Sequence, residues 1–278
     1  MLYQISTPEL ALLKPLCEPL SYHLVLESIL AGNSPGIVFT DHPTNPQAAW
    51  INFKHHCFLL GAPDLPAFNQ ALQSYFRQCF IPKARTQSQD AFLFDSFPAD
   101  WNSILEHLIP GQQPRRYMRQ HFACQSLQQD WRSLIPKGFS LKQVDAALLV
   151  QTHLANLDAV RDEMCSERSS VEDFLRHSFG FCMQHEDELV AWAFSEYNTA
   201  GRCEVGIATV EKYRRMGLGT VVALALVEHA ITNGYHSIGW HCWVNNKPSA
   251  ALARKAGFDH HLDYAVDLFL LPEQKQID

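Results

Sequence analysis

The stretch VEKYRRMGLGTVVALALVEHA, residues 210–230, decides the fold of this chain, because two arginines and two glycines precede an apolar run of helical length. A strand that runs into a helix here leaves the first helical N–H groups unpaired, and with the helix dipole they form an anion site. Gly217 and Gly219 let a phosphate approach the backbone, while Arg214 and Arg215 add positive charge. The stretch predicts a phosphate-binding turn.

Two common phosphate motifs do not fit this turn. A P-loop requires Gly-Lys-Ser/Thr, and the chain has Gly219-Thr220-Val221. A dinucleotide fingerprint requires glycine or alanine at position 222, which is Val222. The pattern that fits is Arg-x-x-Gly-x-Gly between a strand and a long helix.

A second segment, WVNNKPSAALARKAGF at residues 243–258, follows about thirty residues later. Asn246 and Ser249 stand at the start of a helix of small residues, which Gly257 ends. On its own this segment is also typical of a capped helix packed on a sheet.

Together the two segments resemble the Gcn5-related N-acetyltransferases (GNAT), which combine an Arg-x-x-Gly-x-Gly loop with an Asn-x-x-Ser segment ending in Gly-Phe. The resemblance covers roughly residues 138–271. With a degenerate N-terminal half joined to it, the chain looks like the two-part acetyltransferases related to zwittermicin A resistance proteins.

The resemblance implies acetyl-CoA as a cosubstrate, held in a cleft where two parallel strands separate. The main chain of Ala208 and Val210 would pair with the pantetheine, the loop amides would hold the pyrophosphate, and Asn246 and Ser249 would lie near the sulfur. The residues expected to bind it are Ala208, Val210, Arg214, Arg215, Met216, Gly217, Leu218, Gly219, Thr220, Asn246 and Ser249.

The implied reaction is direct attack of an amine on the thioester, which requires a base because an alkyl amine is mostly protonated at neutral pH. Glu204 on the preceding strand is the first candidate, and an exposed strand carboxylate is the structural alternative. His241 is the second candidate, with a packed histidine as its alternative.

The chain departs from the family where a tyrosine acid is usual, because Ala253 occupies that position. Tyr213, Tyr235 and Tyr264 are candidate replacements, and none has a motif to support it. The general acid is therefore unassigned.

The fold class expected is mixed α/β, with a GNAT-like C-terminal domain over residues 137–278 and a smaller N-terminal α/β domain over 1–136. The boundary follows from the break at Pro136 and Gly138. Downstream we expect one helix over 146–164, a hairpin turning at 186–187 and a final hairpin or strand pair over 259–271. The order of elements from residue 36 on resembles the middle of the C-terminal order and suggests a diverged second copy.

Composition narrows the classes of partner. Residues 137–278 carry 13 lysines and arginines against 19 aspartates and glutamates, which disfavours nucleic acid and suits a cationic amine. Acids expected to line the acceptor side are Asp158, Asp162, Glu163, Glu172 and Asp173, with a solvated helix face as the alternative.

We expect neither a metal site nor a membrane segment. The eight cysteines include no Cys-x-x-Cys pair, the histidines lack ligand spacing, and no apolar stretch is long enough to cross a bilayer. The segment after Met1 lacks a basic region, so we expect a cytoplasmic protein.

The function expected is acetyl-CoA-dependent acetylation of a small-molecule amine, such as a metabolite or an antibiotic-like compound. A non-catalytic acyl-CoA-binding or regulatory module and a protein N-acetyltransferase are the alternatives. The sequence identifies neither the acceptor nor the oligomeric state.

Overall fold

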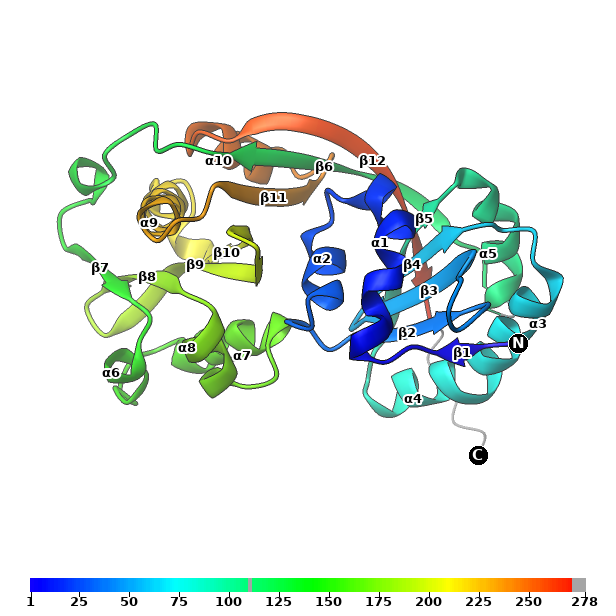
Figure 1. Ribbon diagram of the computed structural model, residues 1–278. Helices are drawn as coiled ribbons and strands as arrows, with labels where there is room; N and C mark the ends of the chain where they lie inside the picture. The colour runs from blue at the N-terminus through cyan, green and yellow to red at the C-terminus, as the bar shows by residue number, and fades with distance from the viewer. Residues whose placement is uncertain (110–111, 272–278) are drawn as a thin grey trace. The chain divides into compact units, whose positions relative to one another are not determined.

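The computed structural model describes residues 1–109 and 112–271, which divide into two compact units. One unit holds Met1–Met118 with the chain from Tyr264 onward, and the other holds Arg119–Asp263. Each unit has a sheet with helices on its faces (Figure 1). The mixed α/β class is therefore confirmed.

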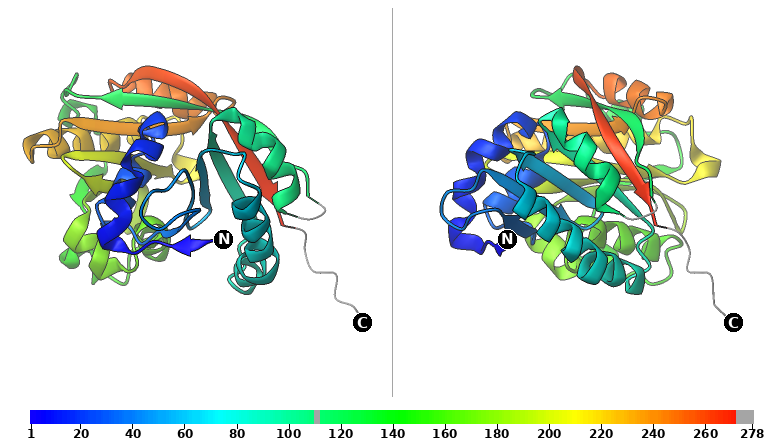
Figure 2. Two further views of the ribbon diagram at one scale, coloured as in Figure 1. Left: turned by 45° about the vertical axis from the view of Figure 1, so that its right-hand side comes forward. Right: turned by 90° about the vertical axis from the view of Figure 1, so that its right-hand side faces the viewer.

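The N-terminal unit contains a sheet in the order β1-β2-β3-β4-β5-β12. Strands β2 to β4 pair antiparallel, while β5 pairs parallel with β4. Helices α3 and α5 lie beside the strands of this unit (Figure 2), and Phe68 and Leu72 of α3 and Leu105 of α5 belong to its core. The elements are β1 (Tyr3–Gln4), α1 (Lys14–Cys17), α2 (Leu24–Leu30), β2 (Ile37–Thr40), β3 (Ala48–Phe53), β4 (His56–Gly61), α3 (Pro66–Tyr75), α4 (Ile81–Thr86), β5 (Ala91–Phe97), α5 (Asn102–Leu108) and β6 (Arg115–Cys124).

The C-terminal unit contains a sheet in the order β6-β11-β10-β9-β8-β7. Helix α9, which the apolar run predicts, is buried against one face of this sheet. Helices α7 and α8 pack on the other face through Val160, Met164 and Phe174. The elements are β7 (Phe139–Gln143), α6 (Ala146–Leu149), α7 (Leu157–Glu167), α8 (Val171–His177), β8 (Gly180–His185), β9 (Glu188–Thr199), β10 (Arg202–Thr209), α9 (Leu218–Thr232), β11 (Ser237–Trp243), α10 (Lys247–Lys255) and β12 (Asp259–Leu270).

The two units share one topology, as the order of elements suggests. In the N-terminal unit, β2-β3-β4 run antiparallel and α3 leads to β5, parallel to β4. In the C-terminal unit, β8-β9-β10 run antiparallel and α9 leads to β11, parallel to β10. The second copy expected in the N-terminal half is therefore present at the level of strand order and pairing.

The predicted boundary at 136/137 is wrong, because the halves exchange their last strands. Strand β6 follows the N-terminal repeat but pairs with β11, from Arg119 with Trp243 to Cys124 with Ile238. Strand β12 follows the C-terminal repeat but pairs with β5. The break at Pro136 is a local turn, since Arg132 and Trp131 just before it bind Glu228 on α9.

Two other predicted elements also need correction. The single helix over 146–164 is broken, because Ala155 bridges to Glu188 and Asn156 adopts a left-handed conformation (φ 65°) whose side chain donates to Leu189 O. The final hairpin over 259–271 is one continuous strand, β12. The hairpin at 186–187 is confirmed, with Glu186 at φ 51°.

Phe122 tests whether β6 belongs to the core of the C-terminal unit. Its side chain is fully buried among residues of β10, β11 and α9. We expect Phe122→Ala to lower the free energy of unfolding by about 3–5 kcal/mol. The control is Tyr117→Ala on the same strand, where the side chain is exposed. Equal effects of both changes in urea unfolding would contradict the assignment.

Candidate active site

Strands β10 and β11 pair for only a short distance. The parallel register joins Arg202 with Ser237, Cys203 with Ile238 and Glu204 with Gly239, and beyond these pairs the described part of the two strands has none. Both strands continue, β10 to Thr209 and β11 to Trp243. Because their facing main-chain groups are not joined there, this edge is free to pair with an extended ligand.

The main-chain groups of β10 that face β11 are not those of the predicted residues, Ala208 and Val210. The amide of Val210 donates to Val190 O, so it is directed toward β9. Backbone directions alternate along an antiparallel strand, which places the groups of Ala208 on the same side. Ile207 and Thr209, which we did not predict, therefore present their main chain toward β11.

The turn before α9 holds unpaired amides, as predicted. Gly217 is the N-cap at φ 82°, and Arg215 is also left-handed at φ 66°. In the described part of the chain, the amides from Arg215 to Gly219 donate to no backbone acceptor. Thr220 differs from the prediction, because its amide donates to Gly217 O at 3.0 Å.

The two positions of the turn hold glycine for different structural reasons. A Cβ on Gly217 would meet nothing within 4 Å, so this glycine borders open space. A Cβ on Gly219 would lie 2.6 Å from Leu252 Cδ1, so this glycine lets α9 approach α10. Arg214 donates from Nε to Thr209 O at 3.3 Å, which links the turn to the end of β10.

Asn246 and Ser249 occupy capping positions. Asn246 Oδ1 accepts from the Ser249 amide at 3.2 Å and caps α10, while Ser249 Oγ accepts from Trp240 Nε1 at 3.1 Å. These hydrogen bonds give both residues a structural role in the protein. Contact of either residue with a ligand stays a prediction.

Glu204 and His241, the two predicted catalytic residues, are neighbours. His241 Nε2 lies 3.3 Å from Glu204 Oε1, and both side chains are about nine-tenths buried. They lie on the face of the sheet opposite α9, because Cys203, Val205 and Trp240 point toward α9. The exposed strand carboxylate considered for Glu204 is therefore wrong.

Glycines in the strands make room for this cluster. A Cβ on Gly206 would lie 1.9 Å from Glu196 Oε1, so the carboxylate of Glu196 rests directly on the backbone of β10. A Cβ on Gly239 would lie 3.0 Å from Glu204 Cγ and 3.3 Å from His121 Nε2. Glycine inside a strand commonly marks such a close approach, and this signal was available in the sequence.

Glu196 is an acidic residue that sequence reasoning missed. It stands opposite Glu204 in the β9–β10 register. Burial raises its pKa well above the usual value, and the negative charges of Glu167, Glu204 and Glu163 add to the effect, while Arg119 opposes it. The site therefore concentrates carboxylates beside the predicted base.

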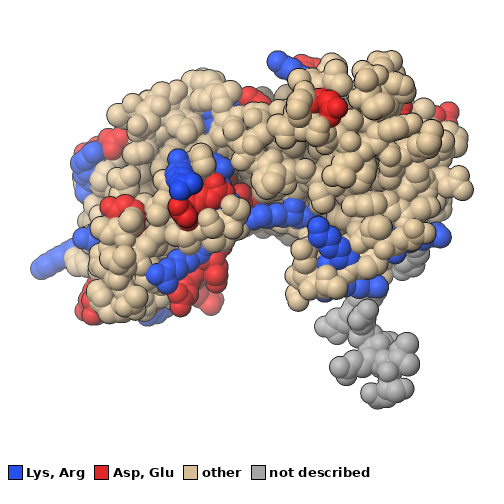
Figure 3. Space-filling view, turned by 60° about the horizontal axis from the view of Figure 1, so that its bottom comes forward, with Lys and Arg blue, Asp and Glu red and all other residues tan. Residues whose placement is uncertain are grey.

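Of the acids predicted to line the acceptor side, only Glu163 interacts with this cluster, and burial raises its pKa. Asp158, Asp162 and Glu172 are exposed, and Asp173 is half-buried. Figure 3 shows acidic and basic side chains close together on one face of the molecule. Asp158 pairs with Arg161 at 3.1 Å, and Asp173 caps the backbone of Ser169. The alternative of a solvated face holds for Asp158, Asp162, Glu172 and Asp173.

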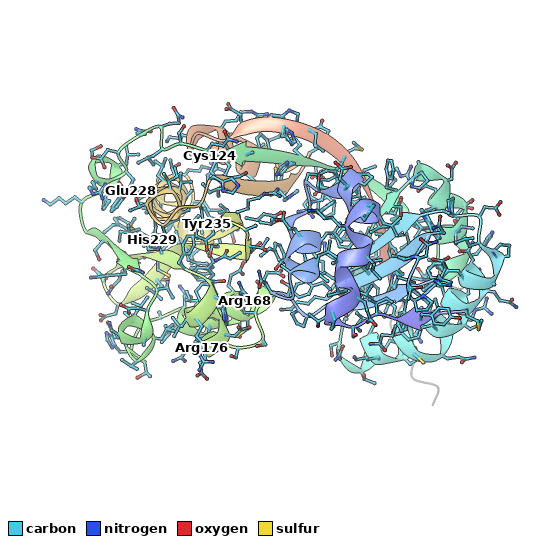
Figure 4. All side chains as sticks on the ribbon, in the orientation of Figure 1. Cys124, Arg168, Arg176, Glu228, His229 and Tyr235 are labelled. Carbon is cyan, nitrogen blue, oxygen red and sulfur yellow. The ribbon has the colours of Figure 1, made fainter. Side chains whose placement is uncertain are left out.

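The three tyrosines proposed in place of the missing acid lie elsewhere. Tyr213 donates to Glu188 at the start of β9, Tyr235 packs on Phe179 before β11, and Tyr264 packs on Tyr22 in the N-terminal unit. Tyr235 is labelled in Figure 4. Ala253, the α10 residue at the position of the family's tyrosine, is itself buried in the core.

Tyr197 is the tyrosine whose electrostatics couple to the cluster. It hydrogen-bonds Glu167, and burial together with the charges of Glu167, Glu196 and Glu204 raises its pKa well above the usual value. Its phenol is therefore held in the protonated form.

In its described residues, the N-terminal unit lacks an equivalent site. Strands β4 and β5 stay paired to their ends, from His56 with Leu93 to Leu60 with Phe97. Pro66, the first residue of α3, has no N–H to offer. Trp101 Nε1 donates to Gly61 O at 3.0 Å, which occupies the carbonyl at the end of β4. The binding geometry is confined to the C-terminal unit.

No metal centre accompanies these residues in the described chain, where no group of three or more His, Cys, Asp or Glu side chains could hold an ion. Over the same residues, no helix is both long and apolar enough to cross a membrane.

Parallel strands that separate beside a helix with free N-terminal amides define an acyltransferase of the GNAT type. The model of the GNAT acetyltransferase family matches residues 14–266, so the chain belongs to this family. It is 27% identical over 240 residues to the uncharacterized N-acetyltransferase YdfB of Bacillus subtilis, covering 86% of this chain and 87% of the relative.

Solved structures agree on the fold. A GCN5-related N-acetyltransferase-like protein from Streptococcus suis aligns with a TM-score of 0.69 at 19% identity, over 94% of this chain and 98% of that one. A tandem GNAT protein from the clavulanic acid biosynthesis pathway aligns with a TM-score of 0.56 at 12% identity, over 97% and 98%. Both alignments extend through the N-terminal unit, in keeping with its repeated topology.

Glu196 yields a prediction for stability. An acid whose pKa is raised on folding contributes most below its unfolded pKa, and that contribution is lost as pH rises toward the folded value. Replacement by glutamine removes this loss. We therefore expect the melting temperature of Glu196→Gln, relative to wild type, to rise between pH 5 and pH 8.

The control for this measurement is Glu211→Gln, which replaces an exposed carboxylate outside the cluster. Its melting temperature relative to wild type should stay constant over the same range. A constant difference for Glu196→Gln as well would contradict the raised pKa.

Proposed function

We propose that the protein transfers an acetyl group from acetyl-CoA to the amine of a small cationic molecule. The observation that carries this proposal is the separation of β10 from β11 after Glu204, next to the free amides from Arg215 to Gly219. An extended chain fits against an unpaired strand edge, and phosphates fit at a helix N-terminus.

The residues present fit this cosubstrate in three respects. The amides of the turn and Arg215 would hold the pyrophosphate, and Gly217 leaves space for it. The main chain of Ile207 and Thr209 would pair with the amides of the pantetheine. When bound, the cosubstrate supplies an activated acetyl group as a thioester.

Glu204 is placed to accept the proton that the substrate ammonium must lose before its nitrogen attacks the thioester carbonyl. The new C–N bond then forms as the C–S bond breaks, and the thiol takes the proton that the nitrogen sheds as the amide forms. His241 Nε2 lies 3.3 Å from Glu204 Oε1 and would pair with the carboxylate when the imidazole is protonated. If Tyr197 protonates the sulfur in place of the family's tyrosine, the proton that the nitrogen sheds returns to the Tyr197 phenolate, so the thiol still gains a single proton.

The charge of the site favours a cationic acceptor. Glu163, Glu167, Glu196 and Glu204 interact electrostatically within one face of the unit, and an amine carrying additional positive groups would lower the cost of this concentration of carboxylates. We therefore expect diamines and polyamines to be better acceptors than monoamines of similar size.

The test of function is release of free thiol from acetyl-CoA when a panel of amines of increasing charge is offered. Thiol release that increases with acceptor charge and falls with added salt supports the proposal. Acetylation of lysine in peptides but of no small amine would instead favour a protein substrate.

A module that binds acyl-CoA without turnover is the second candidate, because the buried Ala253 stands where the family's acid is usual. This function predicts a stabilising effect of acetyl-CoA with no thiol release from any amine. Ligand at about a hundred times Kd would contribute about 2.7 kcal/mol to stability in either case.

Gly217→Asp tests the turn. An added carboxylate would repel the pyrophosphate, so we expect at least a tenfold weaker affinity for acetyl-CoA in calorimetric titration. Gly234→Asp is the matched control, because Gly234 follows the other end of α9 with φ 85° and no atom within 4 Å of its Cβ position. The backbone strain is similar in both variants, so equal affinities would contradict the turn assignment.

Glu204→Gln tests the base. Loss of a general base typically costs 10²–10⁴-fold in rate, and we expect kcat to fall within this range near pH 7 with little change in acetyl-CoA affinity. At high pH, where more of the free amine is present, the difference from wild type should become smaller. A pH–rate profile identical to that of wild type would exclude Glu204 as the base.

A further inference from the structure

Acetylation of an ammonium releases one proton per turnover, since a cationic amine and a thioester become an amide, a thiol and H⁺. In the proposed function this proton first reaches Glu204, whose side chain is only 10% exposed. Because turnover requires an ionised base, the proton must leave a nearly buried carboxylate each time. The structure offers three histidines beside it.

His121 lies next to Glu204 on the same face of the sheet. Its Nε2 and Glu204 Cγ lie 3.3 Å and 3.0 Å from the point where a Cβ on Gly239 would stand, so the two side chains are neighbours above this glycine. The ring of His121 also stacks on that of His241, with centroids 4.5 Å apart and planes at 23°. His121 is 7% exposed.

His261 connects this buried ring to the surface. The Nδ1 atoms of His121 and His261 are 3.1 Å apart, so one ring donates and the other accepts. His261 is exposed. The three side chains Glu204, His121 and His261 therefore form a spatial series from the buried carboxylate to solvent. They lie on strands β10, β6 and β12, respectively.

We propose that His121 and His261 form the route by which the proton taken up by Glu204 leaves the active site. This inference rests on the proposed function. The proton passes from the carboxyl of Glu204 to Nε2 of His121. The positive charge is then shared across the bond between the two Nδ1 atoms, and His261 releases a proton from its Nε2 to water. Exchange with water restores the starting tautomers between turnovers.

The surrounding charges are consistent with a transient positive charge at His121. Glu204 on β10 and Glu196 on β9 favour it, while Arg119 on β6 opposes it together with any charge on His241 of β11. His261 delocalises the charge toward solvent, which lowers the cost of placing it in a buried position.

An unusual consequence is that the strand preceding residue 137 supplies part of the C-terminal site. His121 belongs to β6, which follows the N-terminal repeat along the chain and pairs with β11 at His241. The exchanged strand would therefore have a chemical function in addition to its structural one. Sequence reasoning placed this strand in a separate domain and so could not find His121.

The first experiment uses the full-length chain with His261→Gln, an exposed change that leaves the core intact. We expect kcat near pH 7 to fall about tenfold at low buffer concentration, with the KM for acetyl-CoA unchanged. Added imidazole, which accepts protons from solution, should restore most of the loss. His260→Gln is the matched control, because His260 lies on the same strand and pairs instead with Asp263 at 2.7 Å.

His121→Asn provides the second variant, with a larger expected loss of kcat and the same rescue by imidazole. A purely structural role would lower the melting temperature and would not respond to imidazole. Undiminished kcat in His261→Gln at low buffer, or a loss that imidazole does not restore, would overturn the proposal.

Nuclear magnetic resonance tests the proton route independently of the proposed acetyl transfer. In Glu204→Gln we expect the ring resonances of His121 to change relative to wild type, because the carboxylate beside its Nε2 is gone. The ring resonances of His153, exposed near Asp187, should not change. Absence of thiol release with every amine would overturn the proposed function, whereas unchanged ring resonances of His121 would overturn the route.

Discussion

The short parallel pairing of β10 with β11 is the constraint on which the site depends. Three residue pairs hold the strands together, and the last of them brings Glu204 beside Gly239. Beyond this point, the absence of further pairs leaves main-chain groups of β10 available. Helix α9 begins close to the end of β10, where Arg214 Nε donates to Thr209 O, and Gly219 permits contact with Leu252 of α10. A strand edge, a helix N-terminus and a carboxylate thus share one region.

The N-terminal unit shows what happens to the same topology without that separation. Pairing of β4 with β5 continues to the strand ends, Pro66 replaces a free amide, and the Trp101 indole occupies the carbonyl of Gly61. Each of these features removes one requirement for binding an extended phosphorylated ligand. The repeated fold and the chemical site are therefore separable, because the site depends on a few backbone groups.

Local patterns were sufficient to predict much of the C-terminal unit. The glycine turn, the helix over 218–232 and the hairpin at 186–187 depend on residues close together in sequence, and all are present. Predictions failed where distant pairing decided the result. A bridge from Ala155 to Glu188 breaks the helix expected over 146–164, and the exchange of β6 and β12 moves the domain boundary. The cluster of Glu196 and His121 was missed for the same reason, although Gly206 and Gly239 mark the close approaches.

The reciprocal exchange of strands has a consequence for the order in which the chain folds. Strand β5 is synthesised before the C-terminal repeat, and its neighbour β12 is synthesised after that repeat. The N-terminal sheet therefore keeps this edge open until the C-terminal repeat has been synthesised, and closing it depends on contacts of long sequence separation, which form slowly. An unpaired edge is prone to association with other chains. Synthesis and pairing of β12 is thus the step that ends the exposure of this edge of the nascent chain to aggregation.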